Sequence, residues 1–406
     1  MNNILHCDLN NFFASALVLK YPQYKDCAVA VGGKEEDRHG VIVSANYKAK
    51  QYGIKCEVST YTAKKLCKDV VILESDFEWF SYLSNKVKSI YENFTDKVEQ
   101  FSIDECFLDV TGSHKLFGTS EEIAFKIKER VKNEIGLTIS VGVSFNKCFA
   151  KIGSDLKKPD AITVISQQNY KQVVWNLPIN AMLGIGHQTE EKLKLLNILT
   201  IKDLALTNQD FLVKRFGKQG KLLWEYANGL DNSVVKPQDK NEKPKSVGNS
   251  TTFYKDLSNS KEIKLGITTI CENLVTRLFY LQIFYAKTLQ LIVKDSKMNV
   301  YQKQCQLEGK ISSSNLIENA YKLFVDNYSH LKDIRLLGVT VSNFKEEDTK
   351  QISIFDTTTQ TNKKVDIDKA IIGINNKYNE NIVTRANSLY DKKISNAFNG
   401  RRKKWV

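Results

Sequence analysis

Acidic residues interrupt two segments of this chain that otherwise have the composition of buried β-strands. Ser102, Asp104 and Glu105 lie within the run FSIDECFLDV, and Asp8 follows the apolar stretch ILHC at 4–7. An unpaired carboxylate in apolar surroundings costs several kcal/mol, so acids at the ends of adjacent strands indicate a bound cation. Taken alone, Asp104 and Glu105 fit a solvated turn equally well.

Magnesium is the cation that such a cluster suits best, because Mg²⁺ prefers hard oxygen ligands. Asp8 is followed at once by Asn10 and Phe12, which is typical of a strand that runs into a helix. The acidic turn would join strands at 98–101 and 106–110. We therefore expect three carboxylates at one edge of a sheet, where they can hold two ions about 3.5–4 Å apart for nucleotidyl transfer.

Four segments of the sequence resemble those of one enzyme family. They are HCDLNNFFAS, SANYKAKQYG, FSIDECFLDVTGS and SVGVSFNKCFAKIGSDLKKPD. Their order and spacing resemble those of the Y-family DNA polymerases, which copy damaged templates, over about residues 1–356. The loop GGKEEDRHG and the C-terminal tail look closer to UmuC-like proteins of Gram-positive bacteria and their mobile elements than to the shorter DinB type.

The resemblance implies an α+β multidomain fold, that of a right-hand polymerase. The expected parts are a ferredoxin-like palm (1–18 and 75–165), small fingers (19–74), a helical thumb with a helix-hairpin-helix (166–230), a linker (231–245) and a little finger (246–348). Hydrophobic periodicity agrees, since strands and helices alternate over the palm and the segment 246–345 reads β-α-β-β-α-β. The linker holds two of the five prolines and almost no apolar residue.

A helix-hairpin-helix signature is expected in the thumb. The segment LGIGHQTEEKLKLLNILTIKDL begins with Gly184, Ile185 and Gly186 and continues into a helix expected at about 189–196. Backbone amides at a helix N-terminus can hold a DNA phosphate without reading the base sequence, so we expect these three residues to bind DNA. A short GxG also occurs in plain tight turns, but an apolar pattern follows it here: Leu195, Ile198, Leu199, Ile201 and Leu204.

A short peptide past the little finger, at 349–356, contains Gln351, Ile352, Ser353, Ile354 and Phe355. It resembles the motif with which bacterial polymerases dock in the hydrophobic pocket of the sliding clamp, although so short a motif also occurs in loops and edge strands. The tail at 357–406 has one amphipathic stretch, at 365–389, and from 359 onward carries 11 basic and 4 acidic residues. The tail could equally fold or stay a mobile basic arm.

The resemblance also implies the reaction and its residues. A primer 3′-hydroxyl attacks the α-phosphate of a deoxynucleoside triphosphate, assisted by two Mg²⁺ ions, for which Mn²⁺ can substitute. By their place in the matched motifs, Asp8, Asp104 and Glu105 are the catalytic acids and metal ligands, and the carbonyl of Leu9 completes the ion on the nucleotide side. The nucleotide-binding residues implied are Phe12, Phe13, Ser44, Tyr47, Lys50 and Lys158.

Phe13 stands where the family places an aromatic ring beneath the incoming sugar. It is therefore the expected steric gate against ribonucleotides, with a core position in the first helix as the alternative. Lys50 stands where the family usually has Arg, so a point charge replaces a bidentate fork, unless Lys50 is only a solvated helix position. Cys56 departs from the family's usual small-Met-Pro pattern. Val41 and Val43 would pack against the incoming base pair or serve as ordinary strand residues.

Composition agrees with a nucleic-acid partner, because a net charge of +13 favours a polyanion. The partners implied are primer–template DNA, deoxynucleoside triphosphates and the β sliding clamp, and the resemblance leaves a UmuD-like accessory subunit open. Eight cysteines without a CxxC pair, and five histidines without ligand spacing, indicate a reduced cytoplasmic protein. The sequence has neither a signal pattern nor an apolar run of about 18 residues, so we expect a protein that stays off membranes. We also expect a monomer, which joins the nucleoid when it is bound to DNA.

No segment resembles a proofreading exonuclease or the large fingers of accurate polymerases. We therefore expect low fidelity and tolerance of damaged templates, in a DNA damage response. Two other classes remain. One is a different two-metal enzyme with a palm, such as a nucleotide cyclase, which needs the carboxylates but none of the DNA-binding segments. The other is a catalytically silent DNA-binding scaffold, which is disfavoured because all three acids are present.

Overall fold

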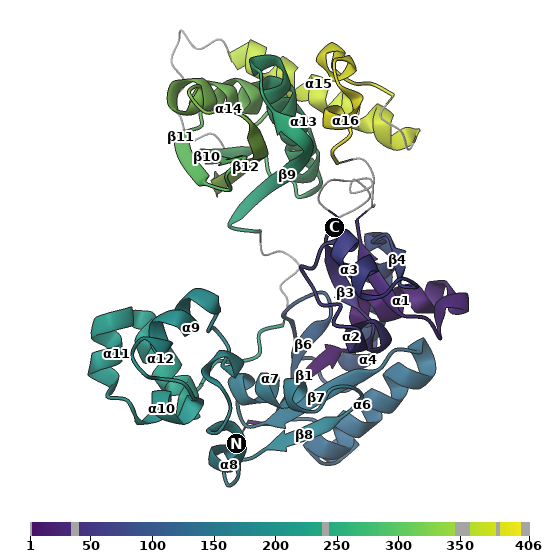
Figure 1. Ribbon diagram of the computed structural model, residues 1–406, viewed down its shortest axis with the longest axis vertical. Helices are drawn as coiled ribbons and strands as arrows, with labels where there is room; N and C mark the ends of the chain where they lie inside the picture. Colours follow the sequence, from purple (N-terminus) through teal and green to yellow (C-terminus); the bar gives the residue numbers. More distant parts are fainter. Residues whose placement is uncertain (1, 34–39, 238–242, 346–357, 379–381, 399–406) are drawn as a thin grey trace. The chain divides into compact units, whose positions relative to one another are not determined.

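The computed structural model describes residues 2–33, 40–237, 243–345, 358–378 and 382–398. The chain forms two compact units, one from Met1–Lys34 with Gly40–Lys240 and one from the remainder. Each unit has a large hydrophobic core of its own, so each can be understood from its own elements. Figure 1 labels these elements in chain order.

The first unit is built around a five-stranded sheet, here called the palm sheet. Its strands, in spatial order, are β5 (Val98–Gln100), β6 (Glu105–Asp109), β1 (Ile4–Leu9), β7 (Ile139–Ser144) and β8 (Ile162–Ile165). The central strand β1 runs antiparallel to both of its neighbours. This arrangement confirms the predicted strands, and it makes the end of β1 a point where residues from three strands meet.

The two faces of β1 have different surroundings, because successive side chains of a strand point to opposite faces. Leu5, Cys7 and Leu9 belong to the core beneath helices α4 (Phe77–Glu92) and α6 (Ser120–Ile135). Residues 4, 6 and 8 face the other side, which α7 (Lys147–Leu156) covers. The acid at position 8 is therefore presented to α7 and to the turn that follows that helix.

Helix α7 packs unusually close to β7 because a glycine lies between them. A Cβ atom at Gly142 would lie 1.8 Å from the carbonyl oxygen of Ala150 and 2.6 Å from the amide nitrogen of Ser154. Gly153 of the helix faces the same position of the strand, because a Cβ atom added to it would lie 3.0 Å from the Cα of Gly142. This close approach brings the polar side chains of α7 within reach of β1.

A smaller three-stranded sheet occupies the segment predicted as fingers. Its order is β3 (Ile42–Ala45), β2 (Val29–Gly32) and β4 (Val71–Leu73), with β2 antiparallel to β3 and parallel to β4. The sequence predicted the first two strands but not β4, which has only three residues. Helix α1 (Phe12–Lys20) leads from the palm into this part, and three further helical segments complete it: η1 (Pro22–Tyr24), α2 (Tyr47–Gln51) and α3 (Thr60–Leu66).

The segment predicted as thumb is helical throughout. Its elements are α8 (Tyr170–Val174), η2 (Ile179–Ala181), α9 (His187–Lys194), α10 (Ile201–Leu206), α11 (Gln209–Phe216) and α12 (Lys218–Ala227). The short helix α5 (His114–Phe117) lies earlier in the chain and belongs to the palm. In Figure 1 the last four thumb elements form one cluster. Their apolar residues share a core cluster with part of α7.

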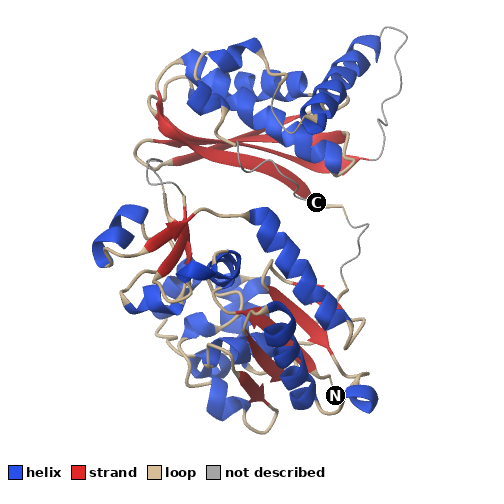
Figure 2. Cartoon of the chain, turned by 90° about the vertical axis from the view of Figure 1, so that its right-hand side faces the viewer, coloured by secondary structure: helices blue, strands red, loops and turns tan. Residues whose placement is uncertain are grey.

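The second unit has the predicted β-α-β-β-α-β order. Its elements are β9 (Ser246–Leu257), α13 (Ser260–Tyr280), β10 (Tyr285–Asp295), β11 (Val300–Gln306), α14 (Ser313–Tyr328) and β12 (Ile334–Lys345). The sheet is antiparallel, in the order β11-β10-β12-β9. Figure 2 shows its helices gathered on one face of the sheet, where the core lies. The α+β fold class is thus confirmed.

The described part of the C-terminal tail is folded and belongs to the second unit. It contains α15 (Thr358–Lys377), η3 (Ala386–Leu389) and α16 (Lys392–Ser395). Ile372, Ile394 and Phe398 are buried in the core of this unit. Asp368 accepts hydrogen bonds from the backbone N–H and the hydroxyl of Ser313, at 2.7 and 2.5 Å. Of the two alternatives for the tail, its described residues therefore support folding.

The beginning of the predicted linker lies against the palm. Val235 is buried beside Ile4 and Phe107, and the backbone N–H of Lys236 donates to Glu99 Oε2 at 2.7 Å.

The eight cysteines are all unpaired. Among the helices of the described residues, none has the length and apolar character that crossing a bilayer requires.

Candidate active site

Asp8 and Glu105 are brought together by strand pairing. They are directly opposite one another on β1 and β6, and Ser140 of β7 pairs with Asp8 from the other side. Side chains of opposite residues in an antiparallel pair lie on the same face, with Cβ atoms about 4.5–5.5 Å apart. Asp8 is only 5% exposed. The structure thus places two of the three predicted acids side by side on the face covered by α7.

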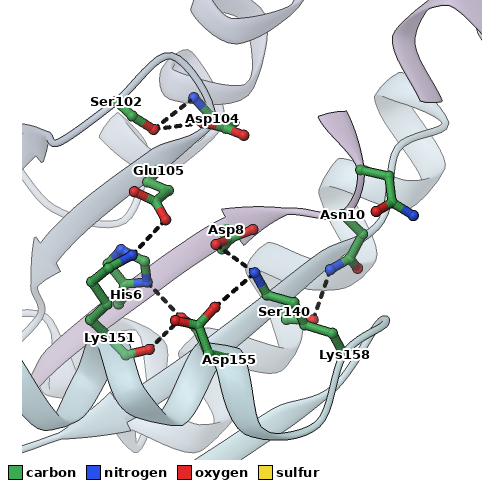
Figure 3. A network of polar contacts seen from close by, with 12 residues as sticks. His6, Asp8, Asn10, Ser102, Asp104, Glu105, Ser140, Lys151, Asp155 and Lys158 are labelled. Atoms are coloured by element: carbon green, nitrogen blue, oxygen red, sulfur yellow. Dashed lines mark hydrogen bonds and ion pairs between the residues drawn. The ribbon is translucent and has the colours of Figure 1, made fainter. Parts of the chain in front are cut away.

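Lysine side chains meet both carboxylates. Lys158 Nζ lies 2.8 Å from Asp8 Oδ2 and also 2.8 Å from Asp155 Oδ1. Lys151 Nζ, on α7, lies 2.6 Å from Glu105 Oε1. Figure 3 shows both lysines reaching the acids from α7 and the turn after it. The predicted nucleotide-binding lysine therefore faces the predicted metal site.

The electrostatics of the site favour added positive charge. Burial raises the pKa of Asp8 to about 7, an effect that Lys158 opposes and the nearby Glu105 reinforces. Burial alone would lower the pKa of Lys158, but Asp8 and Asp155 together raise it above its usual range. A cation beside Asp8 would stabilise its charged form in the same way as the ammonium group does.

Asp104 does not join this pair. Its carboxylate accepts a hydrogen bond from the Ser102 hydroxyl at 2.5 Å, and its carbonyl accepts one from the Leu9 N–H at 3.1 Å. Figure 3 shows the Ser102 contact on the turn, apart from Asp8. Within the described residues, no three His, Cys, Asp or Glu side chains form a ready group of metal ligands. The backbone of the turn is in place, but the three predicted carboxylates do not converge.

Tyr47 and Lys50 come from α2, whose first turn is capped by the Asn46 side chain. Lys50 donates to Asn11 Oδ1, and its ammonium lies 5.2 Å from the centre of the Tyr47 ring. Burial raises the pKa of Tyr47, with Lys158 opposing the shift and Asp8 adding to it. The electric field of the acidic site therefore reaches this helix.

Ser44, the remaining nucleotide-binding residue predicted on this side, lies on β3, and it is buried.

Phe12 and Phe13 have different surroundings at the start of α1. Phe12 is 2% exposed and forms part of the palm core, so its ring cannot touch a nucleotide and only its backbone remains available. Phe13 is half-buried, with its ring 4.5 Å from that of Phe80 and 6.2 Å from that of Phe77. Phe13 therefore packs on the core from its edge, which agrees with both readings of this residue.

The exposed face of the small sheet carries the other residues singled out near the base pair. Val41 and Val43 are exposed, so they are open to a ligand. The thiol of Cys56 donates to the carbonyl oxygen of Val43 at 3.3 Å. This contact joins the segment that differs from the family's small-Met-Pro pattern to the strand.

In the thumb, the glycine motif opens a helix as predicted, though two residues earlier than expected. Gly184 has φ +87°, Gly186 is the N-cap, and α9 begins at His187. Ile185 is buried, so its side chain belongs to the thumb core. In the apolar pattern that follows, Leu195 and Leu199 are 87% and 49% exposed, and the buried members are Ile198, Ile201 and Leu204.

Lys151, Asp155 and Asn10 belong to this site but were not predicted. Lys151 and Asp155 could have been found from the sequence, because their i, i+4 spacing puts them on one face of the helix predicted at 147–156. No sequence pattern indicates Asn10, since its partner Asp160 lies 150 residues away. The predicted clamp-binding residues, 351–355, lie outside the described part of the chain.

Three sequence profiles match the chain. The impB/mucB/samB family matches residues 7–155, the C-terminal domain of that family matches 244–354, and the thumb domain of DNA polymerase iota matches 180–231. The first includes both acids of the site, and the third begins just before the glycine motif.

Curated relatives match nearly the full length. A DNA polymerase IV of Acetivibrio thermocellus is 39% identical over 394 residues, covering 97% of this chain and 98% of the relative. One of Clostridium acetobutylicum is 35% identical over 390 residues, covering 94% and 97%. Both carry the name DNA polymerase IV, so the expected UmuC-type subgroup stays a prediction.

Solved structures share the fold. A Y-family DNA polymerase chimera of Dbh and Dpo4 aligns with a TM-score of 0.75 at 24% identity, over 84% of this chain and 99% of the chimera. DinB from Sulfolobus solfataricus aligns with a TM-score of 0.54, also at 24% identity and over the same shares of the two chains. Profiles, relatives and fold agree, and the chain belongs to the impB/mucB/samB family, the Y-family DNA polymerases.

Proposed function

We propose that this protein is a DNA-directed DNA polymerase that inserts deoxynucleotides opposite damaged template bases. The observation that carries the proposal is the pairing of Asp8 with Glu105 on adjacent strands, with Lys158 on the same face. Paired acids beside a phosphate-binding cation are what nucleotidyl transfer requires. Relatives of nearly equal length are named DNA polymerase IV.

Two Mg²⁺ ions fit the donor set, which consists of hard oxygens: the carboxylates of Asp8, Asp104 and Glu105 and the carbonyl of Leu9. Bound ions would stabilise the charge on the attacking and leaving oxygens, and Mn²⁺ can substitute. Lys151 and Lys158 now neutralise the paired acids. Asp104 would exchange its Ser102 partner when it joins the site.

The triphosphate is bound by cations and amides on one side of these acids. Lys158 and Tyr47 would meet the β- and γ-phosphates, and the free N–H groups at the N-terminus of α1, beginning with Phe12, add a favourable dipole. Lys50 contributes one point charge where a guanidinium would give two parallel hydrogen bonds. Phe13 would close the space beneath the sugar and exclude a 2′-hydroxyl.

Lesion tolerance would follow from how little encloses the base pair. The small sheet offers exposed valines, Val41 and Val43, rather than a large closing helix. Discrimination then depends on pairing and stacking, so errors are frequent and distorted bases are accepted. DNA would be held by backbone amides of the thumb glycine motif and by the second unit, whose segment 246–345 carries 13 Lys or Arg and 8 Asp or Glu.

A sliding clamp is the proposed protein partner. The peptide Gln351–Phe355 lies between β12, which ends at Lys345, and α15, which begins at Thr358. Both elements belong to the second unit, so the peptide is joined to one folded body at both of its ends. A short peptide with apolar anchors is suited to a hydrophobic pocket. A UmuD-like accessory subunit remains a further candidate.

A nucleotide cyclase would explain the paired acids but not the match of residues 180–231 to a polymerase thumb or of 244–354 to a polymerase C-terminal domain. A silent scaffold would not need the pairing of Asp8 with Glu105. Single-nucleotide incorporation with Mg²⁺, opposite undamaged, abasic and bulky-adduct templates, separates the three. Polymerisation on the undamaged template together with insertion opposite a lesion supports the proposal, and no incorporation on any template contradicts it.

Variants of the paired acids test the site itself. Asp8→Asn and Glu105→Gln should each lower incorporation by about a thousandfold, because each removes a charge that holds the ions. DNA binding, measured by fluorescence anisotropy, should be unchanged. The exposed Asp210→Asn on α11 is the matched control and should keep full activity. Activity within about tenfold of wild type in either site variant would contradict the metal assignment.

A further inference from the structure

Asn10 joins the loop after β1 to the turn that carries Lys158. Its side chain is buried, with 2% of the residue exposed. Oδ1 accepts a hydrogen bond from the backbone N–H of Asp160 at 2.9 Å, and Nδ2 donates to Ser140 Oγ at 2.9 Å. The backbone N–H of Asn10 donates to the Thr138 carbonyl at 2.9 Å. Both polar atoms of the side-chain amide and the backbone N–H therefore have a partner, and Figure 3 shows the contact with Ser140.

The orientation of this amide follows from its partners. A backbone N–H can only donate, so the atom of Asn10 that faces Asp160 must be the carbonyl oxygen. The nitrogen then points to Ser140, on the strand that pairs with Asp8. One side chain thus connects the acidic strand, its neighbour β7 and the turn at 158–160.

The turn is held from its other side by α6. Lys128 Nζ donates to the Asp160 carbonyl at 3.1 Å, and Lys132 Nζ lies 3.2 Å from Asp160 Oδ2. Asp160 has φ +54°, in the left-handed region that residues other than glycine, asparagine and aspartate seldom adopt. The hydrogen bond from the Asp160 N–H to Asn10 Oδ1 joins this turn to the loop after β1.

Lys158 lies two residues before Asp160, and its ammonium reaches Asp8 Oδ2 at 2.8 Å. The ammonium can occupy that place only if the turn keeps its distance from β1. The backbone N–H of Val141 donates to the Ala161 carbonyl at 2.8 Å and joins the end of the turn to β7. Asn10 fixes the turn relative to β1, because its side-chain oxygen is bonded to Asp160 while its own backbone N–H is bonded to the Thr138 carbonyl.

We propose that Asn10 is a positioning residue that fixes Lys158, and through it the nucleotide triphosphate, relative to the acids of β1. The role of the triphosphate rests on the proposed function, whereas the holding of the turn does not. Asn10 touches no substrate in this scheme. It acts by restricting where the lysine can be, and its loss would leave the charge present but poorly placed.

The holding of the turn is tested without catalysis. Asn10→Leu keeps the size of the side chain and removes both hydrogen bonds, and Asn10→Ala serves if the leucine variant melts too early to study. Ser140→Ala is the matched control, because it removes the Nδ2 partner and leaves the bond to Asp160. Hydrogen exchange at the Asp160 amide should accelerate about tenfold or more in either Asn10 variant and stay near wild type in the control. Unchanged exchange in the Asn10 variants would overturn the inference.

The action through Lys158 is tested by a double-mutant cycle in single-nucleotide incorporation. Asn10→Leu should raise the KM for the deoxynucleotide about tenfold and change kcat less. In a Lys158→Ala background, the same change should alter kcat/KM by less than about twofold, because its target is already gone. An equal loss in both backgrounds would overturn the inference. If wild type failed to incorporate nucleotides, the proposed function would fail, and the exchange measurement would still decide whether Asn10 holds the turn.

Discussion

Two adjacent phenylalanines begin α1, and the protein uses them differently. Phe12 is enclosed by the palm core, whereas Phe13 is half-buried and its ring lies against those of Phe80 and Phe77. A ring held by two other rings has little freedom to move aside. The proposed role of Phe13 as a steric gate against a 2′-hydroxyl requires such a fixed ring.

Phe13→Ala should keep deoxynucleotide incorporation and gain ribonucleotide incorporation, with discrimination falling by about 1–3 kcal/mol as in other steric pockets. Phe12→Ala is the matched control, because loss of a buried ring costs about 3–5 kcal/mol of stability and leaves the sugar pocket alone. Kinetics with both nucleotide types and a melting temperature for each variant check this. A Phe13→Ala enzyme that loses both activities together would be a core variant, not a gate variant.

At the scale of single residues, the sequence predicted that Asp8 and Glu105 lie together, but not that Asp104 lies apart from them. The alternation of β1 and the pairing with β6 place Asp8 beside Glu105, and both patterns can be read from the chain. The rotamer of Asp104 cannot, because the Ser102 hydroxyl two residues away competes for its carboxylate. Asn10 was missed for a different reason, since its bond to Asp160 depends on the tertiary fold.

Helix α7 is the element on which the site depends, because it presents Lys151 to Glu105 across a very short distance from the sheet. Gly142 permits that distance. Gly142→Ala would drive a methyl group into the Ala150 carbonyl, which is backbone and cannot rotate away. We expect the free energy of unfolding to fall by about 1–3 kcal/mol. Nucleotide incorporation should also decrease, because α7 must shift. Gly112→Ala, with open space around it, is the control. Equal melting temperatures for the two variants would contradict the close packing.

The C-terminal tail is an element of the second unit and not an appendage. Asp368 of α15 accepts two hydrogen bonds from Ser313 at the N-terminus of α14, where an anion is also favoured by the helix dipole. Asp368→Ala should therefore lower the free energy of unfolding by about 1.5–3 kcal/mol, as expected for hydrogen bonds to a charged group. Asp366→Ala, on the exposed side of the same helix, should have little effect. Denaturant unfolding of the full chain distinguishes the two, and equal midpoints would argue against docking of the tail.

The elements themselves were largely predictable, and the exceptions share a cause. The six elements of the segment 246–345 have clear periods of two or 3.6 residues, so their order could be read directly. Strand β4 has three residues and forms through its parallel pairing with β2 rather than through its own pattern. Whether the tail folds could not be predicted, because its burial depends on a core made by elements earlier in the chain.

In the whole molecule, the way the two units are joined decides what the chain between them can do. The predicted linker began at residue 231, but Val235 is buried against the palm and Lys236 is bonded to Glu99. The first part of the predicted linker is therefore attached to the palm as far as Lys236. Low apolar content predicted a linker from residue 231, and one buried valine is too weak a signal to show that its first residues pack against the palm.

The clamp peptide is the feature whose effect belongs to the whole molecule, because it would act by keeping the enzyme near a primer end. Changing Ile354 and Phe355 to Ala removes both apolar anchors and leaves the acids of the site untouched. Incorporation without clamp should be unchanged, and the increase in product length with clamp should disappear. Changing Thr357 and Thr359 to Ala, beyond the motif, is the control and should keep the full response. Equal clamp stimulation of the Ile354 and Phe355 variant and of wild type would show that the peptide serves another purpose.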